Sequence, residues 1–167
     1  GNSITDAVKN TGTILASGGV VLIKAEVIPS LFENAINVEG LVRAVEVEER
    51  GGRIFLVSND NIKVNAAIEA NEVVIGADSS EDIIARNVEI SGPGITAGDG
   101  GINIVAAEDV TVDANITASG DIVLTADQNK DDIGEFTQTT NSVIKAIKGA
   151  DIIIDGSQTM TLNRLEV

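Results

Sequence analysis

A repeated strand-and-turn phrase constrains this chain more than any other feature of its sequence. The stretch from Gly100 to Asp127 contains short apolar runs separated by small, turn-prone residues, and it ends in the phrase ASGDIVLTAD. Similar phrases begin at Ala16 (ASGGVVLIKA), Glu49 (ERGGRIFLVS) and Ile147 (IKGADIIIDG). Because recurrence at a fixed period is the signature of a repeat architecture, the spacing of these phrases decides how the rest of the chain is interpreted.

The spacing alternates between a long and a short interval. The residue before each apolar run serves as a marker, and the markers are Gly19, Gly52, Asn71, Gly101, Gly120 and Ala150. The long interval is about 30 residues and the short one about 19 residues, and periods of about 20–50 residues are typical of solenoids, propellers and arrays. We interpret the short interval as one bare turn of a coil, and the long interval as the same turn with an insertion of roughly ten residues on one side.

The hydrophobic pattern predicts strands and not helices. Almost no window shows the three-and-four spacing of a helix, whereas alternation places Ile62, Val64 and Ala66 on one face. The pairs Val110 with Val112 and Ile102 with Ile104 alternate in the same way. Isoleucine and valine make up about a quarter of the chain, which favours strands. The sequence therefore predicts a coil of parallel strands, whose inward aliphatic side chains stack in rows.

The same pattern divides the chain into turns and insertions within one continuous element, residues 1–167. The predicted turns are Thr13–Ala25, Ile36–Val47 (two strands bent at Gly40), Gly51–Ala77, and Val88–Ala97 with its Gly92-Pro93-Gly94 corner. Surface insertions are predicted at Glu26–Glu33, Asp78–Arg86 and Asp127–Thr140. A short helix is the alternative around Glu26–Asn37 and in residues 1–11.

Charge and composition exclude several classes of partner. The net charge of -15 argues against binding to nucleic-acid backbones or anionic membranes. No apolar run is long enough to span a membrane, and no cysteine is present to form a disulfide. The chain begins at Gly1 without Met and shows no capping repeat, so we expect it to be a segment of a longer repeat protein.

An enzyme active site is not predicted. Asp99, Asp121 and Asp151 occupy comparable places around the markers, and glycoside hydrolysis requires two acids about 5–10 Å apart. The sequence, however, contains no histidine or cysteine for acid–base or nucleophilic chemistry, and no tyrosine or tryptophan to stack on sugars. We expect these acids to form a solvated face, and we assign no catalytic residue.

A calcium loop is the best metal-site hypothesis, and it is incomplete. The run Asp127-Gln128-Asn129-Lys130-Asp131-Asp132 has oxygen side chains at alternate positions, as calcium loops do. Asp132 stands where the turn glycine of an EF-hand belongs, and Gln138 stands where its bidentate glutamate belongs. We expect a polar loop, and we assign no metal or cofactor. The Gly92–Gly101 segment precedes a strand and not a helix, so it predicts no phosphate cradle.

Short motifs in the first half of the chain carry a family resemblance. The pattern N-x-G-x-I-x-A followed by G-G-x-I-x-L matches Asn10, Gly12, Ile14, Ala16, Gly18, Gly19, Val21 and Ile23, and then more loosely Asn37, Gly40, Val42, Ala44, Gly51, Gly52, Ile54 and Leu56. The phrase Ile116–Asp127 is similar. These motifs resemble the shaft repeats of filamentous haemagglutinin-like exoproteins of the two-partner-secretion type.

The resemblance implies a right-handed parallel β-helix (solenoid), with basic coils of about 19 residues and longer inserted coils. It implies a structural or adhesive rod, an adhesin or filament segment that is extracellular or on the outer surface of a Gram-negative bacterium. The partners expected are other copies of the chain, in a fibre or lateral assembly, or a protein or glycan of a host or neighbouring cell. Two alternatives remain open: a carbohydrate-active β-helix enzyme, and a calcium-stabilised surface-layer component.

Overall fold

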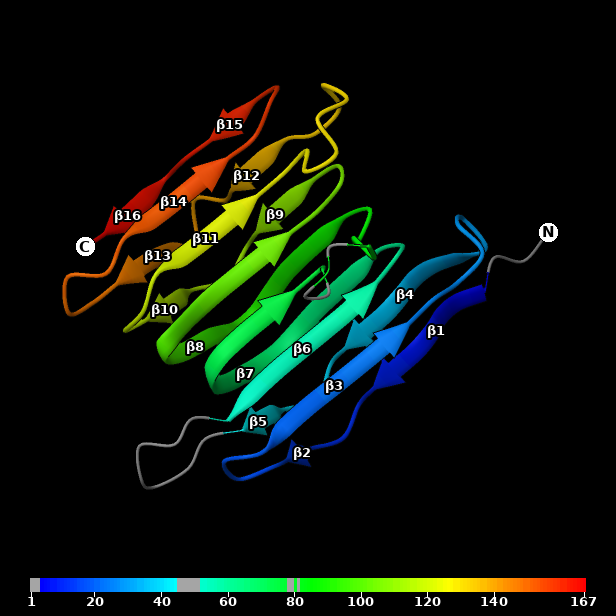
Figure 1. Ribbon diagram of the computed structural model, residues 1–167, viewed down its shortest axis with the longest axis horizontal. Coiled ribbons are helices and arrows are strands. Elements are labelled where there is room, and N and C mark those ends of the chain that lie inside the picture. Colours follow the sequence, from blue (N-terminus) through cyan, green and yellow to red (C-terminus); the bar gives the residue numbers. More distant parts are fainter. Residues whose placement is uncertain (1–3, 45–51, 78–79, 81) are drawn as a thin grey trace.

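The computed structural model describes residues 4–44, 52–77, 80 and 82–167 (Figure 1). These residues form strands and turns and no helix, and the strands join in one hydrogen-bonded sheet. The predicted all-β class is therefore confirmed. The strands are β1 (Ile4–Asn10), β2 (Ile14–Leu15), β3 (Val20–Ala25), β4 (Phe32–Val38), β5 (Val42–Ala44), β6 (Arg53–Ser58), β7 (Ile62–Ile75), β8 (Val88–Val105), β9 (Val110–Val112), β10 (Ile116–Ala118), β11 (Ile122–Thr125), β12 (Phe136–Gln138), β13 (Val143–Ala146), β14 (Ile152–Asp155), β15 (Met160–Thr161) and β16 (Arg164–Glu166).

Successive strands visit three parallel ladders in turn. The first ladder contains β1, β4, the starts of β7 and β8, β9, β12 and β15. The second contains β2, β5, the middles of β7 and β8, β10, β13 and β16. The third contains β3, β6, the ends of β7 and β8, β11 and β14, and it faces the viewer in Figure 1. Each round through the three ladders is called a coil below.

The register of the third ladder explains the alternating intervals of the sequence. Its aligned positions are Val20 with Arg53, Arg53 with Glu72, Glu72 with Gly101, Ile102 with Ile122, and Ile122 with Ile152. The step in residue number from strand to strand therefore alternates between a long and a short value, as the markers predicted. Every predicted interval thus corresponds to one step between neighbouring strands of the third ladder. One marker is misplaced by a single position, because Gly101 lies level with Asp121 and not with Gly120.

The core consists of rows of inward side chains that run from coil to coil. In the second ladder one such row contains only alanine, and all its members are buried: Ala44, Ala70, Ala97, Ala118 and Ala146. Isoleucine, valine and leucine fill the rows on either side, and each contributes about 1.5–3 kcal/mol when buried. The small side chains of the alanine row leave space for these larger neighbours. The inward positions predicted by alternation, including Ile62, Val64 and Ile104, are buried.

The predicted corner at Gly92-Pro93-Gly94 lies inside the long strand β8. The part of β8 before this corner pairs in the first ladder, and the part after it pairs in the second. Gly94 has a φ of +100°, and a Cβ there would lie 2.1 Å from the main-chain oxygen of Asn115. Glycine is therefore required at Gly94, by conformation and by the approach of the next coil.

One predicted insertion contains a strand of the core. Asp127–Thr140 was predicted as a single polar bulge, but β12 occupies residues 136–138 and pairs with both β9 and β15. Phe136 is fully buried and Gln138 is 1% exposed. The prediction was wrong here because the run of polar residues around Phe136 masked a strand of very short length.

The helices offered as alternatives are absent from the described residues. Residues 4–10 form β1, and residues 26–31 form a loop that leads directly into β4, so the predicted insertion at Glu26–Glu33 overlaps the start of that strand. The two strands predicted around Gly40 are β4 and β5. Residues 1–3, 45–51, 78–79 and 81, on which parts of the predicted turns and of the second insertion fall, lie outside the described residues.

Candidate functional site: a loop edge

The three predicted insertions leave the coil at the same corner. Residues 26–31, 76–87 and 126–135 each connect a strand of the third ladder to the next strand of the first ladder. The alternate coils make this connection with short turns, at residues 59–61, 106–109 and 156–159. Long and short connections therefore alternate along one edge of the molecule. We call the three long connections, in their described parts, the loop edge.

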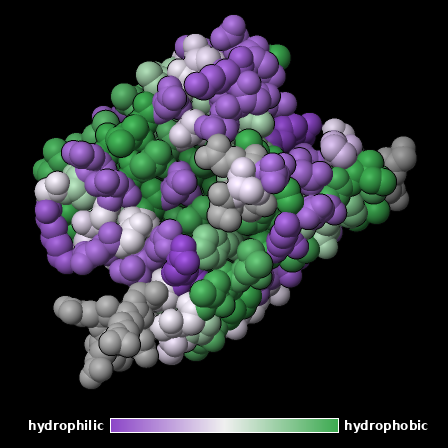
Figure 2. Space-filling model, viewed as in Figure 1, coloured by the Kyte–Doolittle hydropathy of each residue, from purple (hydrophilic) through white to green (hydrophobic). Residues whose placement is uncertain are grey.

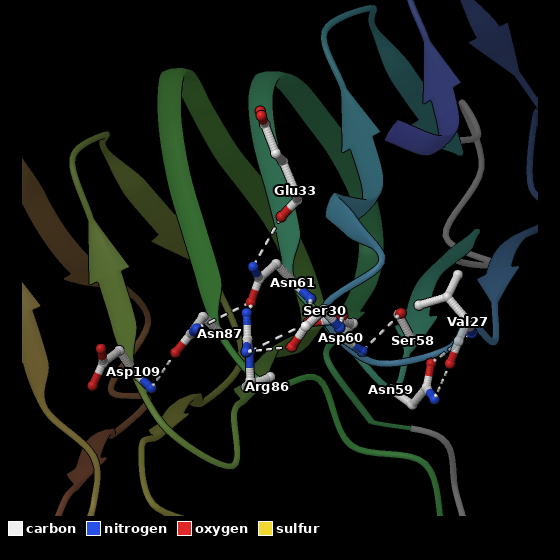
Figure 3. A network of polar contacts seen from close by, with 10 residues as sticks. All are labelled: Val27, Ser30, Glu33, Ser58, Asn59, Asp60, Asn61, Arg86, Asn87 and Asp109. Carbon is white, nitrogen blue, oxygen red and sulfur yellow. Dashed lines mark hydrogen bonds and ion pairs between the residues drawn. The ribbon is translucent and has the colours of Figure 1, made fainter. Parts of the chain in front are cut away.

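The first long loop is fastened to the short turn of the next coil (Figure 3). The side chain of Asn59 accepts a hydrogen bond from the Val27 amide and donates one to the Val27 carbonyl, both at 2.9 Å. One carboxylate oxygen of Asp60 accepts a bond of 2.8 Å from the amide of Ser30, a residue with a φ of 65°. These bonds replace the main-chain ladder that a loop cannot form, and they hold the loop in one conformation.

Arg86, from the second long loop, completes the attachment of the first. Its Nε lies 3.3 Å from Oδ1 of Asp60 and also donates to Oδ1 of Asn61 at 3.3 Å. Its Nη1 donates to the hydroxyl of Ser30 at 3.4 Å. The side chain of Asp60 is only 1% exposed, so the guanidinium compensates a carboxylate that would be costly to bury alone. Two of the predicted insertions thus meet in one polar network.

Asparagine and aspartate side chains connect consecutive coils along the same corner (Figure 3). Asn61 donates to the Glu33 carbonyl at 2.9 Å and accepts from the Asn87 amide group at 3.0 Å. Asn87 in turn accepts from the main-chain amide of Asp109 at 2.9 Å, and Asp109 accepts from that of Glu135 at 2.9 Å. A continuous row of side chains thereby links successive coils beneath the loops.

The second long loop follows the adjacent short turn of the next coil. Ala85 pairs with Ala106 in a parallel bridge, and its carbonyl accepts a hydrogen bond of 2.8 Å from the Ala107 amide. The Arg86 carbonyl accepts a further bond of 2.8 Å from the Glu108 amide. The described end of this loop is therefore part of the hydrogen-bonded frame.

The third long loop contains the calcium-like run, and two of its aspartates, Asp127 and Asp131, accept hydrogen bonds from the loop itself. Oδ1 of Asp127 accepts from the Asp131 amide at 3.1 Å, and Oδ1 of Asp131 accepts from the Ile133 amide at 3.0 Å. A hydrogen bond from the Ser157 hydroxyl, followed by bonds from Asp131, holds the pKa of Asp127 below its ordinary range. Gln138, expected at the last calcium position, lies in β12 instead. Asp127 and Asp131 therefore bind main-chain amides of their own loop.

A cavity of about 300 Å³ lies beside this loop, lined by Ala126, Asp127, Lys130, Asp132, Asp155, Gly156 and Ser157. Lys130 brings a positive charge among its three carboxylates. In residues 4–44, 52–77, 80 and 82–167, no group of three or more acidic side chains is arranged so that it could hold a metal ion.

The three acids weighed as catalytic candidates do not converge. Asp121 and Asp151 are neighbours in register, and Oδ1 of Asp121 accepts a hydrogen bond of 3.0 Å from the main-chain amide of Asp151. Asp99 lies off this row, with Oδ1 3.1 Å from the Lys148 ammonium group. The prediction that Asp99 occupies a position equivalent to Asp121 and Asp151 was therefore wrong. The geometry assigns Asp121 a structural bond between coils.

The loop edge also presents exposed aliphatic side chains that the sequence analysis did not single out. Ile28 is 72% exposed and Leu31 is 45% exposed on the first long loop, and Ile133 is 57% exposed on the third. In the sequence, these residues could have been recognised as isolated aliphatic residues within polar, irregular segments. Rigidly held apolar side chains at a polar surface are typical anchors of protein recognition.

No helix able to cross a membrane occurs in the part of the chain that the structure describes. Comparison with known proteins found no matching family model, no matching curated protein and no matching solved structure.

Proposed function

We propose that this chain is a segment of a right-handed parallel β-helical rod that presents the loop edge to a partner. The observation that carries the proposal is that, of the connections from the third ladder to the first, the three longer ones lie on alternate coils at one corner. A scaffold of regular coils with longer loops at one edge is suited to recognition, because loops held on a rigid scaffold commonly carry binding residues. The proposed protein is structural or adhesive and is not an enzyme.

The shaft beneath the loops provides the stiffness that presentation requires. Each coil is hydrogen-bonded to its neighbours in three ladders, and its inward side chains pack against those of the coils on both sides. In such a solenoid no coil is stable alone, so neighbouring coils stabilise one another. The strands stacked in its longest ladders give the rod a length of roughly 30 Å, from the spacing of strands in a sheet.

The cellular setting of the proposal comes from the resemblance of the shaft repeats to filamentous haemagglutinin-like exoproteins. We propose an extracellular location, or one on the outer surface of a Gram-negative bacterium. A partner there is a protein or glycan of a host or neighbouring cell.

Adhesion of coated particles tests this function. Fluorescent microspheres carrying the full chain are applied to cultured epithelial cells, and the particles retained after washing are counted. The test variant combines Ile28→Ser, Leu31→Ser and Ile133→Ser. The matched control combines Leu15→Ser, Val20→Ser and Leu165→Ser, which change side chains of similar exposure in strands of the second ladder and at the start of β3, away from the loop edge.

We expect the loop-edge variant to lose retention by about tenfold, because exposed apolar anchors dominate recognition energies. The control variant should be retained like the parent chain. Equal retention of both variants, or retention of the parent chain no greater than that of albumin-coated particles, contradicts the proposed adhesive role. Circular dichroism of each variant confirms that the strands persist.

A further inference from the structure

The three outer faces of the coil differ in chemistry. The central outward row of the first ladder is polar throughout: Lys9, Asn37, Lys63, Glu89, Thr111, Thr137 and Thr161. That of the second ladder is polar except at its first position: Leu15, Arg43, Glu69, Thr96, Thr117, Lys145 and Glu166. Both rows are what a solvated face of a sheet requires.

The equivalent row of the third ladder is apolar at all but one position. Its members, in register, are Leu22, Phe55, Val74, Asn103, Val123 and Ile153. The two end members are well exposed, Leu22 at 60% and Ile153 at 51%. Figure 2 shows this face, with hydrophobic surface over β3. A largely apolar row across a sheet face, interrupted by Asn103 and lying beside two polar faces, indicates a contact surface.

The rows that flank the apolar row carry opposite charges at the two ends of the face. On the N-terminal coils they contain Lys24, level with Val57, and Arg53, level with Val20. On the C-terminal coils they contain Asp121, Asp151 and Asp155. The basic side chains have partners within the chain, since Lys24 lies 3.1 Å from Glu26 and Arg53 lies 2.5 Å from Glu72. Among the described residues, neither flanking row places a base beside the C-terminal acids.

We propose that the third face binds a second copy of this chain, with the two strand directions parallel and the two coil axes antiparallel. This arrangement follows from a two-fold axis that lies between the faces and runs along the strands. Under this symmetry each copy presents the same patch, as in any isologous dimer. The first strand of the face in one copy, β3, then lies over the last strand of the face in its partner, β14.

The proposed symmetry brings together two apolar pairs and two pairs of opposite charge, and it also places Val74 over Asn103 and Val20 over Asp151. Leu22 faces Ile153 and Phe55 faces Val123 in the central row, so apolar side chains meet one another. In the flanking rows Lys24 faces Asp155 and Arg53 faces Asp121, so charges of opposite sign meet. The other face-to-face symmetry, with coil axes parallel, brings Asp151 against Asp155 and is disfavoured by repulsion between like charges.

The size of the face predicts a weak dimer. Strands spaced at about 4.8 Å, with about 3.3 Å per residue along each, give a face of roughly 400–500 Å² per copy. The total of roughly 800–1,000 Å² lies at or below the low end of specific protein interfaces. The net charge of -15 on each copy also opposes association. Dimerisation is therefore expected at micromolar to millimolar concentrations.

This inference rests on the proposed rod, because it needs the third face to continue straight from coil to coil. Sedimentation equilibrium of the full chain over a range of concentrations at physiological salt gives the dissociation constant. Val123→Asp should raise that constant at least about tenfold, because it buries a charge in an apolar contact. Thr117→Asp, an outward substitution in the adjacent second ladder, should leave it unchanged.

A charge exchange tests the antiparallel arrangement without removing apolar surface. Lys24→Glu and Asp155→Lys should each weaken the dimer, and the double variant should restore it, because both copies then present the reversed pair. A chain that stays monomeric, a dimer unaffected by Val123→Asp, or a double variant no tighter than the single variants overturns the proposal.

Failure of the dimer and failure of the rod are distinguishable. Small-angle scattering of the monomeric Val123→Asp variant reports whether the shaft keeps a length of roughly 30 Å. A parent chain that stays monomeric, with a variant of that length, removes the dimer and leaves the proposed rod in place. If the parent chain, like the variant, scatters as a shorter or disordered particle, both the dimer and the rod are contradicted.

Discussion

At the scale of the residue, an asparagine or aspartate placed at a corner before a strand connects one coil to the next. Its side-chain oxygen accepts a hydrogen bond from the main-chain amide at the equivalent position of the following coil. The described residues include Asn87 to Asp109, Asp109 to Glu135, Asn115 to Val143 and Asp121 to Asp151, all between 2.9 and 3.0 Å. The corners are where the ladders are interrupted, so these bonds satisfy amides that would otherwise lack a partner.

Replacing Asn87 with alanine should therefore lower the free energy of unfolding by about 1–3 kcal/mol, because its bonds to Asn61 and Asp109 are both lost. The measurement is urea-induced unfolding followed by circular dichroism. Asn129→Ala provides the control, since Asn129 bonds locally to exposed Asp131. A loss of stability as large for Asn129→Ala as for Asn87→Ala argues against a special role of the corner.

At the scale of the element, even very short strands contribute buried side chains to the core of the C-terminal coils. The strand β12 spans only Phe136–Gln138, yet it is paired on both sides and its phenylalanine is fully buried. So short a strand is sufficient here because the neighbouring coils supply both the hydrogen-bonding partners and the walls around the side chain.

Phe136→Ala should lower the free energy of unfolding by about 3–5 kcal/mol, because it leaves a cavity among packed rows. Ile133→Ala, earlier in the same connection, removes a side chain that is 57% exposed and should cost far less. Thermal and urea unfolding of the two variants make the comparison. Similar effects of both substitutions are incompatible with the assignment of Phe136 to the core.

The sequence was sufficient to predict the all-β class, the spacing of the strands in the third ladder and the inward rows. Alternation identified Ile62, Val64 and Ile104 as inward, because period-two burial is a local property of a strand. The sequence was not sufficient for β12, because so short a strand between polar turns carries too little pattern. It also did not predict that Ser30, Asp60 and Arg86 form one network, since such contacts depend on how connections fold over the next coil.

At the scale of the whole molecule, the acidic side chains have opposite effects on contacts between copies and on contacts within one copy. The net charge of -15 opposes any approach of two copies. Within one copy, several carboxylates stabilise the coil. The Lys9 ammonium holds the pKa of Glu39 below its ordinary range, and the Lys145 ammonium does the same for the pKa of Glu166.

Stability should therefore be retained from neutral pH down to the ordinary carboxyl range and fall below it. A carboxyl whose folded pKa is lowered contributes stability above its unfolded pKa, and this contribution is lost as the pH falls through the folded pKa. Asp127 belongs to this group, through the Ser157 hydroxyl first and the Asp131 bonds second. In Ser157→Ala, the pKa of Asp127 measured by NMR should rise toward its ordinary value, and the melting temperature should fall less between neutral and acidic pH than in the parent chain. An unchanged Asp127 titration contradicts this account.

The alternation of long and short connections has a consequence for how the number of coils can change during evolution. Two consecutive coils, such as those from Arg53 to Gly101, contain one long and one short connection. Duplication or deletion of such a pair leaves every ladder in register, since the next coil meets the same strand spacing and the same kind of corner. A lineage can thus lengthen or shorten the molecule in steps of two coils, gaining or losing one loop at each step, without redesigning what lies on either side.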